Sequence, residues 1–185
     1  MIRRLFVGIL LGLAVGTVAP AQPVDLSPER FSFDPDLTYD ARVPTPEAAL
    51  GYEIGTQFTL HADAVGYLRS VAEASDRVAI GTYGETYEGR TLLYLVVTSP
   101  QNQGRLDELK RNSRRLSAPA TLSEAERQQL LAEQPVFVSL SYNIHGNEPA
   151  STEAALQTAY RLAAAQTDST RALLRDAVVI LYPTV

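Results

Sequence analysis

Residues 135–153 read PVFVSLSYNIHGNEPASTE, and the order of residue types in this stretch decides the fold. Val136–Tyr142 is short, apolar and β-branched, which predicts a buried strand. Asn143–Glu148 is polar and contains one glycine, which predicts a loop. Pro149 suits the first turn of a helix, where its missing N–H is not needed, and helix-forming residues fill Ala150–Ala165. The stretch therefore predicts a strand, a tight loop and a helix.

Further strands and helices are predicted around this unit. Helical spacing and capping residues indicate helices at 59–75, at 106–116 and from Thr121 or Ser123 to about Glu133, with one more short turn at 170–175. Apolar runs indicate strands at 77–82, 91–99 and 177–182, the first two joined as a hairpin with a loop longer than two residues. Because strands and helices alternate, the second half predicts an α/β sheet with helices on its faces.

The two ends of the chain carry their own signals. Arg3 and Arg4 precede Leu5–Val18, a continuous apolar run, and Ala19–Ala21 offers a small-x-small cleavage site. A membrane-spanning helix needs about 20 apolar residues, so we interpret residues 1–21 as a signal peptide for secretion or periplasmic export, not as a stable membrane anchor. At the other end, a buried strand stops three residues before Val185. Because that edge would lie open, we expect the chain to be the N-terminal piece of a longer protein.

Composition limits the classes of function. The chain has 185 residues and 0 Cys, so its stability must come from a core, a metal or a partner and not from disulfides. The net charge is −5, and no basic patch is present, which argues against a nucleic-acid partner. Proline-rich residues 22–57 predict a surface lead-in, which leaves 58–185 as the globular part.

His145 and Glu148 are the candidate metal ligands. Both follow a predicted buried strand, and ligands of open α/β sheets gather at the carboxyl ends of strands. An imidazole nitrogen with a carboxylate oxygen suits zinc, and Gly146 is expected to keep the loop between them compact. The alternatives are a loop histidine bonded to backbone and a glutamate that stabilises a helix N-terminus. His61, on a predicted helix far upstream, is expected to be a surface residue.

Three segments together resemble the zinc metallocarboxypeptidases related to carboxypeptidases A, B, D and E. They are YGETYEGR at 83–90 followed by TLLYLVVTS, which resembles the family's early hairpin; PVFVSLSYNIHGNEPAS at 135–151, which resembles its first zinc motif; and AVVILYPTV at 177–185, which resembles the strand leading to its next conserved segment. The likeness covers about 58–185. It also extends to large secreted bacterial members with a proline-rich lead-in.

The resemblance implies a fold and a cofactor. The fold would be a mixed, mostly parallel twisted sheet with helices on both faces, incomplete in this chain. His145 and Glu148 would both bind one zinc ion per complete catalytic domain. The family's second zinc histidine, its substrate-binding arginine and its catalytic glutamate would lie beyond Val185, so no catalytic residue is assigned in this chain. Asn147 stands where one branch of the family has a substrate-contacting arginine, and it is expected to bind no metal.

Three functions are compatible with these residues. The first is a secreted zinc carboxypeptidase-like enzyme that cleaves peptides or proteins near their C-terminus. The second is an amidohydrolase acting on N-acyl amino acids, from a related branch that shares His-x-x-Glu. The third is a non-catalytic exported domain of the same fold that binds peptide or sugar. The sequence favours the first, because the export signal and lead-in are unusual for the second.

Overall fold

The computed structural model describes residues 37–184, so the predicted signal peptide at 1–21 lies outside the described residues. Residues 22–36 of the predicted lead-in also lie outside them. The described elements are, in chain order, α1 (Pro46–Leu50), α2 (His61–Ala74), β1 (Val78–Glu85), β2 (Thr91–Val97), α3 (Pro100–Gln103), α4 (Leu106–Ser117), a 3₁₀ turn (Pro119–Thr121), α5 (Glu124–Glu133), β3 (Val136–Ser141), α6 (Ala150–Ala164), α7 (Asp168–Asp176) and β4 (Ala177–Tyr182).

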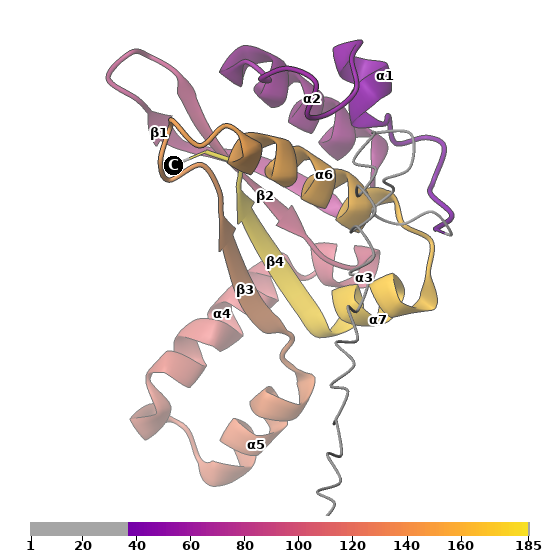
Figure 1. Cartoon of the computed structure of the whole chain (residues 1–185). Coiled ribbons are helices and arrows are strands. Elements are labelled where there is room, and N and C mark those ends of the chain that lie inside the picture. The colour runs from indigo at the N-terminus through magenta and orange to yellow at the C-terminus, as the bar shows by residue number, and fades with distance from the viewer. Residues whose placement is uncertain (1–36, 185) are drawn as a thin grey trace, which may run out of the picture. The chain divides into compact units, whose positions relative to one another are not determined.

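The four strands form one sheet in the order β1-β2-β4-β3 (Figure 1). β3 and β4 pair in parallel, whereas β1 with β2 and β2 with β4 pair antiparallel. The prediction of a mostly parallel sheet is therefore wrong for these residues, although the sheet is mixed as expected. The reason is local: a hairpin loop of a few residues forces β1 and β2 to be antiparallel, and the β3–α6–β4 crossover is the one connection that yields a parallel pair.

One face of the sheet carries the main hydrophobic core. Alternate side chains of β2, Leu93, Leu95 and Val97, point to this face and are completely or almost completely buried. They pack with residues of α2 and α6, including Leu68 and Leu156, both fully buried. Figure 1 shows α2 and α6 lying side by side across this face. This layer fixes the start of α6, and therefore the loop that precedes it.

Within residues 37–184, the opposite face is covered only in part. Tyr94 and Val96 of β2 lie there with Val178 and Ile180 of β4, and they line a cavity of about 270 Å³ together with Leu106 at the start of α4. Helices therefore lie on both faces of the sheet, as the sequence predicts. The uneven cover follows from composition, because α4 is highly charged and buries only Leu109 fully.

Most predicted elements are confirmed within a few residues, and two helices, α3 and α7, differ. Among the confirmed elements, α5 is capped by Ser123 through a reciprocal capping box with Glu126, which stabilises a helix that has little apolar surface. The short turn predicted at 170–175 is a nine-residue helix, α7, because Thr167 caps it from outside the predicted range. The four-residue helix α3, capped by Ser99, was not predicted.

Part of the predicted lead-in packs against the globular unit. Thr45 caps α1, Gly51 ends it with φ of +81°, and Tyr39 forms an isolated β-bridge with Ala165. Val43 is 3% exposed and belongs to the core. The division of the chain at residues 57 and 58 stays a prediction. Among the helices of residues 37–184, none is both long enough and apolar enough to cross a bilayer.

Candidate metal centre

The loop between β3 and α6 places His145 and Glu148 at the carboxyl end of the parallel strand pair. The Tyr142 N–H donates to the carbonyl of Tyr182, so β3 and β4 remain paired up to the start of the loop. The Asn143 N–H then donates to the Ser151 hydroxyl at 2.7 Å, which ties the start of the loop to the first turn of α6. These two bonds fix both ends of a short loop.

Within the loop, a tight turn brings the two candidate ligands together. The Glu148 N–H donates to the carbonyl of His145 at 3.0 Å, and this bond directs both side chains to the same side. His145 Nδ1 lies 3.3 Å from Glu148 Oε1. The side chains are 68% and 65% exposed, so solvent can reach both. The predicted convergence of His145 and Glu148 is therefore present.

The separation of these two atoms suits a shared metal better than a direct bond. Charge-assisted nitrogen–oxygen bonds are usually about 2.7–2.9 Å long. Two ligand atoms on one tetrahedral zinc, each about 2.0–2.2 Å from the metal, lie roughly 3.4 Å apart. An imidazole nitrogen and a carboxylate oxygen are also donor types that zinc accepts. The residues present therefore fit a zinc ion in geometry and in chemistry.

A catalytic zinc usually takes three protein ligands and leaves one position open. Within residues 37–184, no group of three or more His, Cys, Asp or Glu side chains is placed to hold a metal ion. His61, the other histidine, contacts the carbonyl of Thr91 through Nε2 at 3.0 Å and is half-buried. The described residues thus supply two candidate ligands.

Comparison with known proteins gives the family. Residues 65–185, more than half of the chain, match the zinc carboxypeptidase family, and the matched range contains both His145 and Glu148. The chain belongs to the zinc carboxypeptidase family. Among solved structures, carboxypeptidase A from Helicoverpa armigera is similar, with a TM-score of 0.49 and 16% identity over 74% of this chain. No curated protein matches the sequence.

The chain covers 28% of the length of that solved carboxypeptidase A chain. Family membership makes it part of a zinc-dependent hydrolase family and confirms the resemblance seen in the three sequence segments. It does not test the individual ligands, so the assignment of His145 and Glu148 stays a prediction. Asn147 lies between them, is exposed, and forms no hydrogen bond with the other described residues.

In this zinc carboxypeptidase loop, the residue with special backbone geometry is Asn143. Its φ is +52°, in the left-handed region where asparagine is tolerated better than most residues. Gly146, expected to keep the loop compact, does not need to be glycine on steric grounds, because a Cβ there would meet no atom within 4 Å. The sequence signal for this bend is Asn143, directly after the predicted strand Val136–Tyr142. Gly146 is not the residue that shapes the loop.

A second acidic residue, Glu153, anchors the neighbouring loop and was not predicted. It lies in the first turn of α6 and is 8% exposed. Its carboxylate accepts from the Thr59 N–H at 2.8 Å and from the Thr59 hydroxyl at 2.9 Å. The Tyr52 hydroxyl donates to the same Thr59 oxygen at 2.7 Å. Glu153 therefore fixes residues 52–59 against the helix that begins beside the candidate metal ligands.

Proposed function

We propose that this protein is an exported, zinc-dependent carboxypeptidase-type peptidase in which His145 and Glu148 supply two of the protein ligands to one zinc ion. The observation that carries the proposal is the 3.3 Å separation of His145 Nδ1 and Glu148 Oε1 in a chain of this family. The third protein ligand and the group that activates water are assigned to residues other than those described.

The roles of the two side chains follow from the chemistry of ligation. Zinc, when bound, acts as a Lewis acid that polarises the carbonyl group of a substrate. His145 must present a neutral Nδ1, so its proton is held on Nε2. Glu148 must be ionised, and the bond between its N–H and the His145 carbonyl keeps its side chain beside the ring. Because both ligands lose protons on binding, zinc affinity should fall in acid.

The proposed substrate is a peptide or protein cleaved near its C-terminus, and this choice rests on the family match. The proposed setting is extracellular or periplasmic, and it rests on Arg3, Arg4, the apolar run Leu5–Val18 and Ala19–Ala21. N-terminal sequencing of exported protein tests the setting. A mature start at Gln22 supports it, and soluble protein that retains Met1 contradicts it.

The metal assignment is tested on the protein expressed from its full reading frame. Zinc per chain is measured by elemental analysis, and activity is measured on N-blocked peptides with a free C-terminus. His145→Ala and Glu148→Ala should each weaken zinc binding by at least about a hundredfold, since even residues that only orient ligands contribute 10- to 100-fold. Both variants should lose peptidase activity.

Asn147→Ala is the matched control, because Asn147 lies in the same turn and is equally accessible. It should keep stoichiometric zinc. If His145→Ala retains full zinc and normal activity, the metal assignment is wrong, and the interpretation as a loop histidine beside a helix-stabilising glutamate replaces it. If zinc is bound through both residues but no peptide is cleaved, the metal site stands and the peptidase proposal fails.

A further inference from the structure

A second site lies at the end of the sheet opposite to His145. It is a cavity of about 640 Å³. Arg77 lies just before β1, Ser99 just after β2, and Arg171 and Arg175 on α7 just before β4. Because β3 and β4 are parallel, the start of β4 and the loop after β3 lie at opposite ends of the sheet. The cavity is therefore separate from the candidate metal centre.

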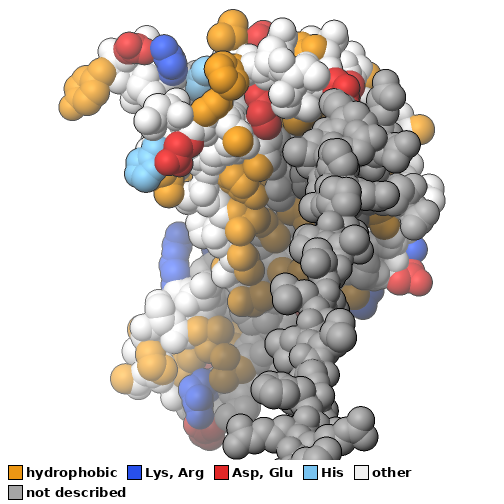
Figure 2. Space-filling model, viewed as in Figure 1, with side chains coloured by type: hydrophobic (Ala, Val, Ile, Leu, Met, Phe, Trp, Pro, Cys, Tyr) orange, Lys and Arg blue, Asp and Glu red, His pale blue; other side chains and the backbone are white. Residues whose placement is uncertain are grey.

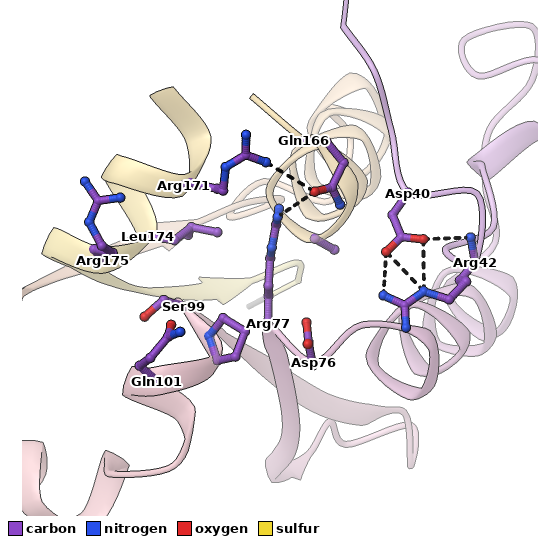
Figure 3. A pocket seen from close by; sticks show the side chains of 12 residues that line it. Asp40, Arg42, Asp76, Arg77, Ser99, Gln101, Gln166, Arg171, Leu174 and Arg175 are labelled. Carbon is purple, nitrogen blue, oxygen red and sulfur yellow. Dashed lines mark hydrogen bonds and ion pairs between the residues drawn. The ribbon is translucent and has the colours of Figure 1, made fainter. Parts of the chain in front are cut away.

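Arg77 is the central side chain of this cavity and is only 8% exposed (Figure 3). Its Nη1 donates to the carbonyl of Ala165 at 2.7 Å and to that of Leu162 at 3.4 Å. Both acceptors are neutral, and no carboxylate in residues 37–184 forms an ion pair with Arg77. Burial lowers the pKa of Arg77; the charge of Asp76 opposes this shift, Arg171 adds to it, and Asp40 opposes it more weakly. The guanidinium still carries its charge, because arginine stays protonated in proteins.

A second guanidinium approaches the same point. Gln166 Oε1 accepts from Arg77 Nη2 at 3.4 Å and from Arg171 Nη1 at 3.5 Å. Figure 3 shows the tips of both arginines directed at this single oxygen atom. Both distances are at the long limit for a hydrogen bond, so the Gln166 oxygen holds each group weakly. Arg171 Nη2 also donates to Asp168 Oδ1 at 2.8 Å, which leaves its Nη1 directed at Gln166. An anion between them would make stronger, charge-assisted bonds to both.

The other charged groups of the cavity leave it positive. Four arginines and two aspartates line it, a net charge of +2 in a chain whose overall net charge is −5. Asp40 is already engaged by Arg42 through bonds as short as 2.6 Å, and Asp168, outside the cavity lining, pairs with Arg171. The Arg175 side chain forms no hydrogen bond or ion pair with the rest of the described chain. Asp76 is exposed, forms no hydrogen bond or ion pair within the described residues, and acts on the neighbouring Arg77 through its charge alone.

We propose that this cavity binds a phosphate group, through Arg77 and Arg171. Guanidinium forks match the oxygen spacing of phosphate, and the two guanidinium groups already converge on one oxygen atom. The volume of about 640 Å³ falls within the roughly 300–1,000 Å³ of sites that enclose small organic molecules. The phosphate is therefore either a free ion or one carried on a small organic molecule.

The test measures dissociation constants of inorganic phosphate and of phenyl phosphate by calorimetry at low ionic strength. The protein carries His145→Ala throughout, so that phosphate bound to a metal does not contribute and the result does not depend on the peptidase proposal. Arg171→Gln should weaken phosphate binding about tenfold or more, the effect of losing one charge-assisted bond. Arg171 is exposed, so this variant should fold normally.

Arg114→Gln is the matched control, because Arg114 is an exposed arginine on α4 that does not line the cavity. Its dissociation constant should stay within about twofold of the parent value. Tighter binding of phenyl phosphate than of phosphate identifies an organic phosphate as the ligand, and equal binding identifies the free ion. The proposal is overturned if neither probe binds below about 10 mM, which corresponds to less than about 3 kcal/mol of binding free energy. It is also overturned if Arg171→Gln and Arg114→Gln have the same effect.

Discussion

At the carboxyl ends of β3 and β4, His145 and Glu148 are about two-thirds exposed and contact mainly each other. At the opposite end of the same sheet, Arg77 is buried and bonded to the last carbonyls of α6. Figure 2 shows an exposed histidine and neighbouring acidic side chains at the first end. The charged groups at the first end therefore lie on an open loop, whereas Arg77 at the second end lies buried against the end of α6.

This difference in burial separates side chains that can bind a ligand without affecting stability from side chains that also stabilise the fold. An exposed pair on a loop contributes little to stability, so it is free to bind a metal. A buried guanidinium satisfies helix-end carbonyls that would otherwise lack partners, so its removal affects folding as well as any ligand. Substitutions of buried groups, such as Arg77, should therefore lower the free energy of unfolding more than substitutions of exposed groups at the metal end.

The largest expected effect is that of Arg77→Ala. The change removes bonds to the carbonyls of Leu162 and Ala165 and leaves a buried space, which should lower the free energy of unfolding by about 3 kcal/mol. Urea denaturation measures this. Arg175→Ala, at an exposed arginine of the same cavity, should change stability by less than about 0.5 kcal/mol. A loss below about 1 kcal/mol for Arg77→Ala would mean that Arg77 is not a structural anchor.

Glu153→Ala should have the next largest effect, about 2 kcal/mol, because the Thr59 N–H and hydroxyl both lose a charged, buried acceptor. Glu153→Gln keeps one acceptor oxygen and should lose roughly half as much. Glu148→Ala is the comparison at the metal end, with a side chain 65% exposed and no such anchor. Equal losses for Glu153→Ala and Glu148→Ala in zinc-free protein would contradict the assigned roles.

The two ends of the sheet also differ in how much of their arrangement the sequence predicts. His145 and Glu148 are three residues apart, so a local pattern was enough to pair them, and the strand and helix on either side followed from apolar runs. Arg77 and Arg171 are far apart in sequence and meet only because the start of β1 and the end of α6 lie beside α7. Glu153 and Thr59 are 94 residues apart, and they too are brought together only by the tertiary fold.

The sheet itself shows the same limit. The strands were predicted from their apolar runs, but the direction in which β2 and β4 pair depends on contacts between residues about 84 positions apart, such as Val96 and Ile180. The pattern within each strand carries no information about that direction. The expectation of a mostly parallel sheet came from the resemblance and failed at this pairing.

His145→Ala should leave the stability of the zinc-free protein within about 0.5 kcal/mol of the parent, since the ring is 68% exposed. The same variant should lose zinc, so metal binding and stability separate at this residue. Thermal unfolding with and without a chelator measures both effects: zinc should raise the unfolding temperature of the parent and leave that of the variant unchanged. A marked destabilisation of the zinc-free variant would show that His145 is part of the packing.

The smallest effect concerns Asp40, whose contribution to stability is lost in acid. Arg42 bonds to both carboxylate oxygens of Asp40 through its side chain and to one through its N–H, which lowers the Asp40 pKa from 3.8 to about 2. Between these two pKa values the unfolded chain binds a proton that the folded chain does not, so stability rises with pH there. The contribution is complete above about pH 4 and is lost as pH falls towards 2.

Asp40→Asn should therefore flatten the dependence of the urea midpoint on pH between about 4 and 2, and it should lower the midpoint at pH 7 by the same amount, which is small because exposed ion pairs contribute little. Arg42→Gln should produce the same flattening, since the side-chain bond to Arg42 is the main cause of the lowered pKa. If the acid slope persists in both variants, other carboxylates cause it. The Asp40–Arg42 pair would then contribute no measurable pH-dependent stability.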